Sequence, residues 1–143
     1  MTTEHNAAVR ALLADNVLAV VATNSSSGFP QSAVVALSET EELELIFATF
    51  DDTRKFANLA ADQRLSLVVG WNNENKRTLQ IEGFARLAEG DEQERAADIH
   101  CAKSVASRRF RDDPRQRYFI VRPVWLRYSD YMAQPKDIWE YNF

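Results

Sequence analysis

Residues 43–59 read LELIFATFDDTRKFANL, a strand pattern followed directly by the start of a helix. Within residues 43–49, Leu43, Leu45 and Phe47 occupy alternate positions, with Glu44 and Ile46 between them, which is the period of a β-strand. Asp52 or Thr53 can then cap a short helix, because either side chain can accept a hydrogen bond from a free backbone N–H group. The stretch therefore predicts a strand whose end leads straight into a helix N-terminus.

The helix start in this stretch gathers groups that bind anions. Free backbone N–H groups and the helix dipole favour a phosphate at such a terminus. Thr53 adds a hydroxyl, Arg54 a two-pronged donor and Lys55 a compact positive charge. The preceding strand ends at Thr49, close to all three. The spacing by itself fits two interpretations: a phosphate site, or a capped surface helix with two solvated cations.

The rest of the chain alternates short strands with a few helices. Apolar spacing predicts one helix from Thr3 to about Asn16 and another that opens at Gly90. Pro123 is expected to divide the two strands on either side of it. Many short strands joined by tight turns favour a mainly β domain with helices (α+β), an antiparallel barrel with the helices packed outside. The predicted strands are residues 17–23, 32–37, 43–49, 65–71, 77–87, 118–122, 124–131 and, as a terminal edge strand, 138–142.

The composition excludes several classes of protein. The 143 residues, 45% hydrophobic and 27% charged, suit one globular domain spanning residues 1–143. With 17 basic and 21 acidic residues the net charge is −4, which argues against a nucleic-acid partner. No apolar run reaches the roughly 18 residues that span a bilayer, so no membrane association is expected. No Cys/His spacing indicates a metal site.

The cellular location is inferred from what the sequence lacks. The first residues, MTTEHN, have neither the basic nor the apolar region of a secretory signal. Cys101 is the single cysteine and cannot form a disulfide within the chain. A reducing, cytoplasmic location is therefore expected.

Four segments, taken in order, resemble the pyridoxamine 5′-phosphate oxidase-like FMN-binding split-barrel family. The most specific element is a strand ending in Thr, followed by a Thr-Arg-Lys triplet at a helix start. The resemblance implies an antiparallel six-stranded split β-barrel of the FMN-binding type. It also implies a homodimer, with FMN at the subunit interface. The four segments are GFPQSAVVAL at 28–37, LELIFATFDDTRKFANL at 43–59, RLSLVVGW at 64–71 and TLQIEGFARL at 78–87.

The resemblance assigns roles to individual positions. Thr53, Arg54 and Lys55 would hold the FMN phosphate. The strand 33–37 would lie along the isoalloxazine, with the backbone of Val34 and Val35 at its polar edge. The other cofactor-binding residues implied by the match are Ala33, Ala48, Thr49, Thr78 and Gln80.

Some positions depart from the pattern of the true oxidases. Ala33 stands where they carry an Arg, and Ser38 where they carry a Lys. Thr78 falls where they carry a Gln that contacts the flavin, and Gln80, on the same strand face, is a candidate to replace it. These departures argue against the oxidation of pyridoxamine phosphate.

The sequence thus predicts an FMN-dependent oxidoreductase that moves a hydride or electron pair between the flavin and a small substrate. The cofactor carries such chemistry and the protein positions it, so no catalytic residue is assigned. Two alternatives are a non-catalytic module that stores or senses a flavin, or holds haem or a deazaflavin, and a dimeric scaffold without any flavin.

Several other features are interpreted as structural. Asp51 and Asp52 are expected to act as a helix cap and a dipole partner. The arginine-rich stretch 108–117 is expected to be a solvated loop. His100 and Cys101 are neighbours on a helix, where successive side chains point about 100° apart, so they are interpreted as packing residues rather than a catalytic pair. The C-terminal aromatic residues are expected to meet a partner subunit, and these are Trp139, Tyr141 and Phe143.

Overall fold

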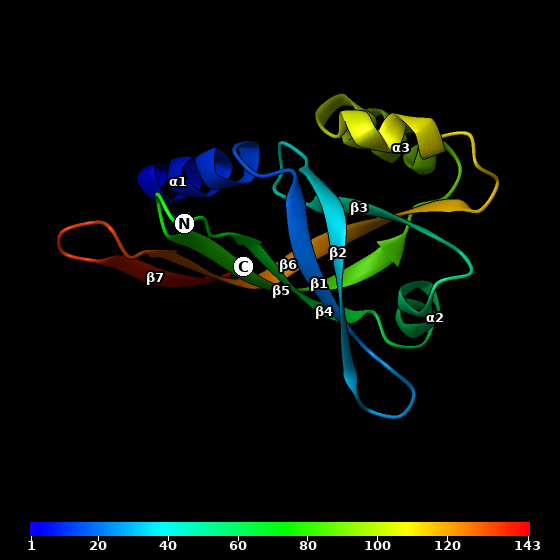
Figure 1. Ribbon diagram of the computed structural model, residues 1–143, viewed down its shortest axis with the longest axis horizontal. Coiled ribbons are helices and arrows are strands. Elements are labelled where there is room, and N and C mark those ends of the chain that lie inside the picture. Colours follow the sequence, from blue (N-terminus) through cyan, green and yellow to red (C-terminus); the bar gives the residue numbers. More distant parts are fainter.

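The computed structural model describes the whole chain, residues 1–143, as a barrel of antiparallel strands with helices around it (Figure 1). The helices are α1 (Thr3–Ala14), α2 (Arg54–Ala61), α3 (Asp91–Lys103) and the short 3-10 helix η1 (Val105–Phe110). The strands are β1 (Leu18–Asn24), β2 (Pro30–Glu39), β3 (Leu45–Phe50), β4 (Arg64–Gly70), β5 (Arg77–Leu87), β6 (Gln116–Asp130) and β7 (Asp137–Asn142).

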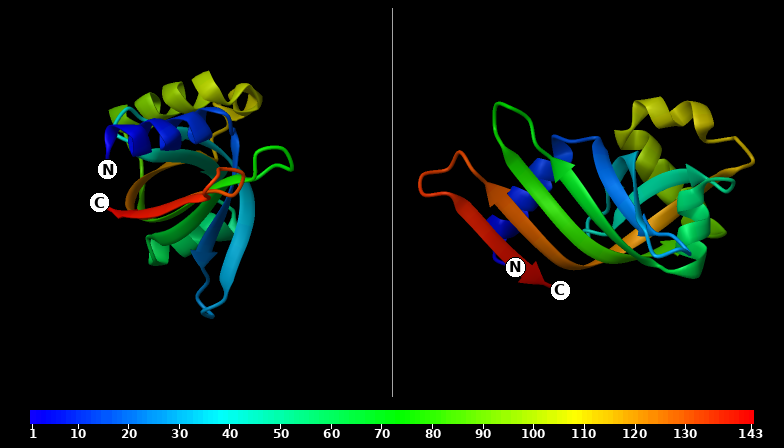
Figure 2. Two further views of the ribbon diagram at one scale, coloured as in Figure 1. Left: turned by 90° about the vertical axis from the view of Figure 1, so that its left-hand side faces the viewer. Right: turned by 60° about the horizontal axis from the view of Figure 1, so that its bottom comes forward.

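The sheet closes because β6 pairs with three other strands. Its order is β3-β2-β1-β4-β5-β6-β7, and an additional pairing of β3 with β6 joins the ends of a six-stranded barrel. β7 extends the sheet beyond the barrel as an edge strand (Figure 2). All of these pairings are antiparallel, which confirms the α+β fold with a six-stranded barrel that the sequence predicted.

The barrel is split at the junction of β2 and β3. β2 pairs with β1 over residues 30–36, but with β3 only over residues 37–39. β3 turns instead to β6, which it pairs over residues 45–50. The edge of β2 before residue 37 is therefore free on the side away from β1.

β6 is a single strand, so the predicted break at Pro123 is wrong. The register between β5 and β6 shifts between Glu82 and Gly83, where Gly83 pairs with Pro123 and Glu82 with Trp125. A bulge at this point removes the need for the ladder hydrogen bond that a proline cannot donate. A Cβ atom on Gly83 would lie 2.7 Å from the carbonyl oxygen of Arg122, which explains the glycine.

The core fills the barrel, and α1 contributes to it. The helix buries Val9, Leu12 and Leu13, the apolar stripe expected from their spacing. Its N-cap is Thr2, whose hydroxyl accepts a hydrogen bond from the His5 N–H at 3.0 Å, so Thr3, the predicted first residue, is already within the helix. α3 covers a second, smaller apolar cluster, and α1 and α3 lie along the same side of the barrel (Figure 2).

Candidate functional site: a phosphate corner and a split-barrel cavity

The corner between β3 and α2 is fixed by two threonine hydroxyls. Thr53, in extended backbone conformation, is the N-cap of α2, and its Oγ1 accepts a hydrogen bond from the Phe56 N–H at 3.3 Å. The Thr53 hydroxyl donates to the carbonyl oxygen of Phe50 at 2.9 Å. Because its one proton is used there, the Thr49 hydroxyl, 2.9 Å away, is the donor to Thr53 Oγ1. Of the two predicted caps, Thr53 is therefore the correct one.

The first turn of α2 is positively charged. It contains Arg54, which is exposed, and Lys55, which is half-buried, with no acidic residue among them. The pKa of Lys55 is below its usual range, mainly because the side chain is partly buried and also because the positive charge of Arg54 lies next to it. The backbone N–H groups of both residues have no acceptor within the chain. These groups suit the phosphate of FMN, which needs several donors and a positive field.

Two adjacent cavities meet at this corner and share Thr53 and Lys55. The smaller, of about 160 Å³, is polar. The larger, of about 290 Å³, lies in the split between β2 and β3. The other residues lining the smaller cavity are Thr23, Gln31, Ser32, Ala33 and Arg54. The other residues lining the larger cavity are Val34, Val35, Ala36, Ala48, Thr49, Phe50, His100, Ser107, Phe110 and Gln116.

The free edge of β2 offers backbone groups to the larger cavity. The Leu37 N–H donates to the carbonyl oxygen of Val17 at 2.8 Å, and bonded residues alternate along an antiparallel ladder. Val35 therefore uses its backbone groups on β1, whereas Val34 and Ala36 direct theirs to the free edge. Of the two strand positions that the resemblance assigns to the polar edge of the flavin, Val34 has the available N–H and C=O.

The structure brings together the predicted site residues of β2, β3 and α2, but not those of β5. Gln80 lies in the same outward-facing row as Val34, with Val20 and Val68 between them. Three strand spacings separate the two residues, a distance of about 14 Å. Within one chain, Gln80 and its neighbour Thr78 are therefore too far from the cavity at β2 to line it.

Sequence reasoning missed the far wall of the larger cavity, which comes from α3, η1 and the start of β6. His100 was interpreted as a packing residue, and it is indeed 1% exposed, yet it also lines this wall. Its Nδ1 lies 3.1 Å from Ser38 Oγ. Burial is the main cause that lowers its pKa to about 4, so the imidazole is neutral near pH 7. Cys101 beside it is buried and unpaired.

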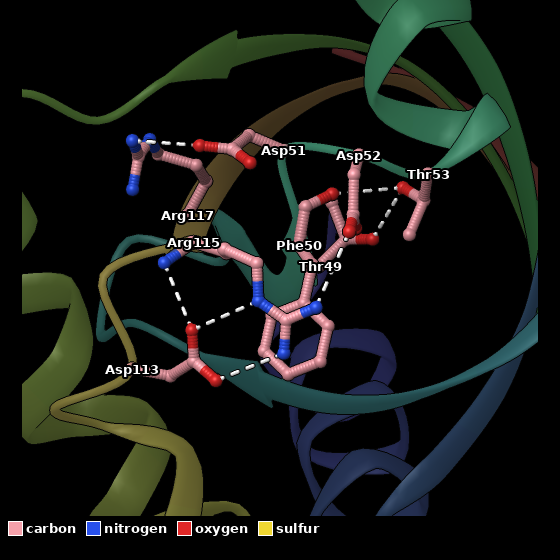
Figure 3. A network of polar contacts seen from close by, with 8 residues as sticks. All are labelled: Thr49, Phe50, Asp51, Asp52, Thr53, Asp113, Arg115 and Arg117. Atoms are coloured by element: carbon pink, nitrogen blue, oxygen red, sulfur yellow. Dashed lines mark hydrogen bonds and ion pairs between the residues drawn. The ribbon is translucent and has the colours of Figure 1, made fainter.

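The acidic pair before α2 has a different role from the one predicted. Asp51 and Asp52 do not cap the helix but form ion pairs with Arg117 and Arg115 (Figure 3). Arg115 also pairs with Asp113 at 3.1 Å. The arginine-rich stretch is accordingly not a solvated loop throughout, because it contains η1 and then the first residues of β6.

No group of three or more His, Cys, Asp or Glu side chains is placed to hold a metal ion. None of the helices is both long enough and apolar enough to cross a lipid bilayer.

Comparison with known proteins identifies the family. The sequence model described as pyridoxamine 5′-phosphate oxidase matches residues 6–141. The chain belongs to this family. A search of the curated proteins gives no match.

Solved structures with the same fold extend over nearly the whole chain. A heme binding protein from Mycobacterium smegmatis has a TM-score of 0.80 at 19% identity over 93% of this chain, which spans only 55% of that longer protein. A pyridoxamine 5′-phosphate oxidase-related, FMN binding protein from Nostoc punctiforme has a TM-score of 0.72 at 16% identity, covering 99% of this chain and 91% of that one. A general stress protein 26-related protein of the pyridoxinephosphate oxidase family from Clostridium acetobutylicum has a TM-score of 0.77 at 12% identity, covering 100% and 97%.

Proposed function

We propose that this protein is an FMN-binding oxidoreductase that transfers a hydride or electron pair between the flavin and a small substrate. The observation that carries the proposal is the pair of adjacent cavities that share Thr53 and Lys55. One is polar and lies at a positively charged helix start, as a phosphate requires, and the other is larger and lies along a free strand edge. The proposal includes a cytoplasmic location, for which the single unpaired cysteine is the support.

The residues around the two cavities divide the work of binding. Arg54, Lys55 and the free N–H groups of α2 would bind the phosphate, while Thr49 keeps the Thr53 cap in place. The backbone groups of Val34 at the free edge of β2 would orient the ring, and Ala33, Val35 and Ala48 would form apolar wall against it. When bound, the isoalloxazine supplies the electron transfer, and the chain's own residues position it and exclude water.

Oxidation of pyridoxamine phosphate itself is not part of the proposal. Ser38, where the true oxidases carry a Lys, is 1% exposed and interacts with His100. Ala33 adds no charge to the smaller cavity. β2 therefore carries no cationic side chain that could hold a substrate phosphate.

The proposed active form is a homodimer. The outward face of β1, β2 and β4 carries an apolar patch, with Leu18 60%, Val20 43%, Val34 66% and Val68 43% exposed. Burying such a face against a second copy removes it from water. It would also bring Thr78 and Gln80 of the second copy, which lie on the adjoining strand, towards β2. The predicted role of the C-terminal aromatic residues in this contact has less support, because Trp139 is stacked between His5 and Tyr128 of its own chain.

Non-catalytic binding of a flavin or of haem is the second candidate. It is favoured by the heme-binding neighbour and by a histidine, His100, in the wall of the larger cavity. One fold can host several functions, so the fold does not distinguish an FMN-dependent oxidoreductase from a non-catalytic flavin or haem protein. Identifying the bound ligand does.

The absorption spectrum of the purified protein, reconstituted separately with FMN, riboflavin and haem, is the first experiment. The proposal expects a flavin spectrum and tighter binding of FMN than of riboflavin. Anaerobic photoreduction, followed by reoxidation with candidate acceptors, then measures electron transfer. A haem spectrum with no flavin binding would overturn the proposal in favour of the second candidate, and binding of neither would favour a scaffold.

A further inference from the structure

Two carboxylates stand at the very corner where a phosphate would bind. Asp51 and Asp52 immediately precede Thr53, Arg54 and Lys55. Left unpaired, they would cancel the two cations of α2 and repel a doubly charged phosphate. A phosphate site at this corner needs something to neutralise them.

Arg117 and Arg115, on the neighbouring segment at the start of β6, pair with these carboxylates. Arg117 Nη2 lies 2.8 Å from Asp51 Oδ2, and Arg115 Nη1 lies 3.2 Å from Asp52 Oδ2. Figure 3 shows Arg117 beside Asp51 at the left, Arg115 reaching over Phe50 towards Asp52, and the Thr49–Thr53 contact at the right. The carboxylates are thus directed to the arginines and not to the first turn of α2.

Both arginines are also held by groups other than these two carboxylates. Arg117 Nη1 donates to the carbonyl oxygens of Pro114 and Gln116, each at 2.8 Å. Arg115 bonds to Asp113 through both Nε and Nη2, and its guanidinium lies 4.3 Å from the centre of the Phe50 ring. Because the guanidinium groups have these additional contacts, we expect them to stay in place when Asp51 or Asp52 is replaced.

We propose that Arg115 and Arg117 are positioning residues of the phosphate site, which neutralise Asp51 and Asp52 and so leave Arg54 and Lys55 free to attract the phosphate. This inference rests on the proposed function. With both arginines counted, the corner remains positive even after the charge of Asp113 is included. Exposed ion pairs contribute little to stability, so this electrostatic role is their main effect.

The first test substitutes each arginine and measures dissociation constants for FMN and riboflavin by flavin fluorescence. Arg115→Gln and Arg117→Gln are expected to weaken FMN binding by about threefold to tenfold, less so at high salt. Riboflavin binding should not change, because riboflavin lacks the phosphate. Arg111→Gln is the matched control, since Arg111 forms ion pairs with Asp98 and Glu94 in the same region but touches neither Asp51 nor Asp52.

The second test uses the direction of the change in FMN affinity to distinguish charge neutralisation from a purely structural role of the ion pairs. Asp51→Asn and Asp52→Asn remove the repelling charge while the arginines remain, so FMN should bind about threefold to tenfold more tightly. If the ion pairs only held the loop, the same variants would bind FMN more weakly. These variants also keep the test valid if an arginine variant does not fold.

Failure of this inference is distinguishable from failure of the proposed function. If Arg54→Ala weakens FMN binding but Arg115→Gln and Arg117→Gln do not, the positioning role is wrong and the phosphate site stands. If Asp51→Asn and Asp52→Asn weaken FMN binding, neutralisation is wrong. If the parent binds riboflavin as tightly as FMN, the phosphate site itself is wrong, and the inference is wrong with it.

Discussion

The hydroxyls of Thr49 and Thr53, whose oxygens are 2.9 Å apart, connect the end of β3 to the N-cap of α2. The Thr49 hydroxyl donates a hydrogen bond to Thr53 Oγ1, and the same oxygen accepts a second hydrogen bond from the Phe56 N–H. One pair of hydroxyls therefore fixes both the strand end and the orientation of the first helical turn. Any ligand that binds the free N–H groups of that turn depends on this contact.

Replacing the cap should loosen the corner. Thr53→Val keeps the shape of the side chain but removes the hydroxyl, which should lower the free energy of unfolding of the ligand-free protein by about 1 kcal/mol. Thr53→Ser retains the hydroxyl and is the control. Urea unfolding followed by circular dichroism measures both, and equal stability of the valine variant and the parent would contradict the capping role.

The buried imidazole of His100 should make stability depend on pH. Its pKa falls to about 4 in the folded protein, against 6.5 for the free side chain. Above pH 6.5 the imidazole is neutral in both the folded and the unfolded protein, so its titration does not affect the free energy of unfolding. As the pH falls from 6.5 towards 4, the unfolded chain binds a proton that the folded chain does not, so stability decreases, by up to about 3 kcal/mol.

Stability measured between pH 4 and pH 8 checks this dependence. His100→Gln, which cannot titrate, should lose the part of the decrease that lies between pH 6.5 and pH 4. His5→Gln is the control, because His5 is half-buried in the first turn of α1, where it stacks on Trp139. A His100→Gln variant with the parental pH profile would show that another group is responsible.

The glycine at the β5–β6 bulge is expected to tolerate no side chain. In Gly83→Ala the new Cβ would lie 2.7 Å from the Arg122 carbonyl oxygen and 2.8 Å from Val121 Cγ1. Because the Arg122 oxygen belongs to the backbone, the clash is relieved only if the two strands move apart, which should lower the free energy of unfolding by about 1–3 kcal/mol. Thermal unfolding measures the loss, and Glu82→Ala, an exposed neighbour, should lie close to the parent.

Sequence periodicity predicted most elements because strands and helices are local patterns. The local motif also placed Thr49 beside Thr53 and Lys55, since these residues lie within a few positions of each other. It did not find His100, Ser107 or Gln116, because these join the site only through tertiary contacts. Gln116 arrives by the pairing of β3 with β6, between segments about seventy residues apart, and His100 lies on α3 beside Ser38 of β2. Asp51 and Asp52 were misinterpreted for the same reason.

The apolar outer face yields a prediction about assembly. Val34→Asp should convert the proposed dimer into a monomer, because Val34 is 66% exposed on one chain and a buried charge without a partner is costly. Light scattering at micromolar concentration measures the mass. Glu89→Lys is a control charge change, placed at an exposed position in the β5–α3 connection, outside the strands. A parent protein that is monomeric with flavin bound would exclude the interface-bound cofactor.

The sharpest prediction concerns Arg54 and Lys55 together. Hydrogen bonds to charged groups contribute about 1.5–3 kcal/mol each, and about 1.4 kcal/mol is tenfold in affinity, so Arg54→Ala should weaken FMN binding by about tenfold to a hundredfold. The double variant with Lys55→Ala should purify without colour. Its melting temperature without flavin should change little, because Arg54 is exposed and Lys55 only half-buried, whereas the stabilisation that added FMN gives the parent should largely disappear. Parental FMN affinity in the double variant would refute the phosphate assignment, since no other cationic side chain lines either cavity.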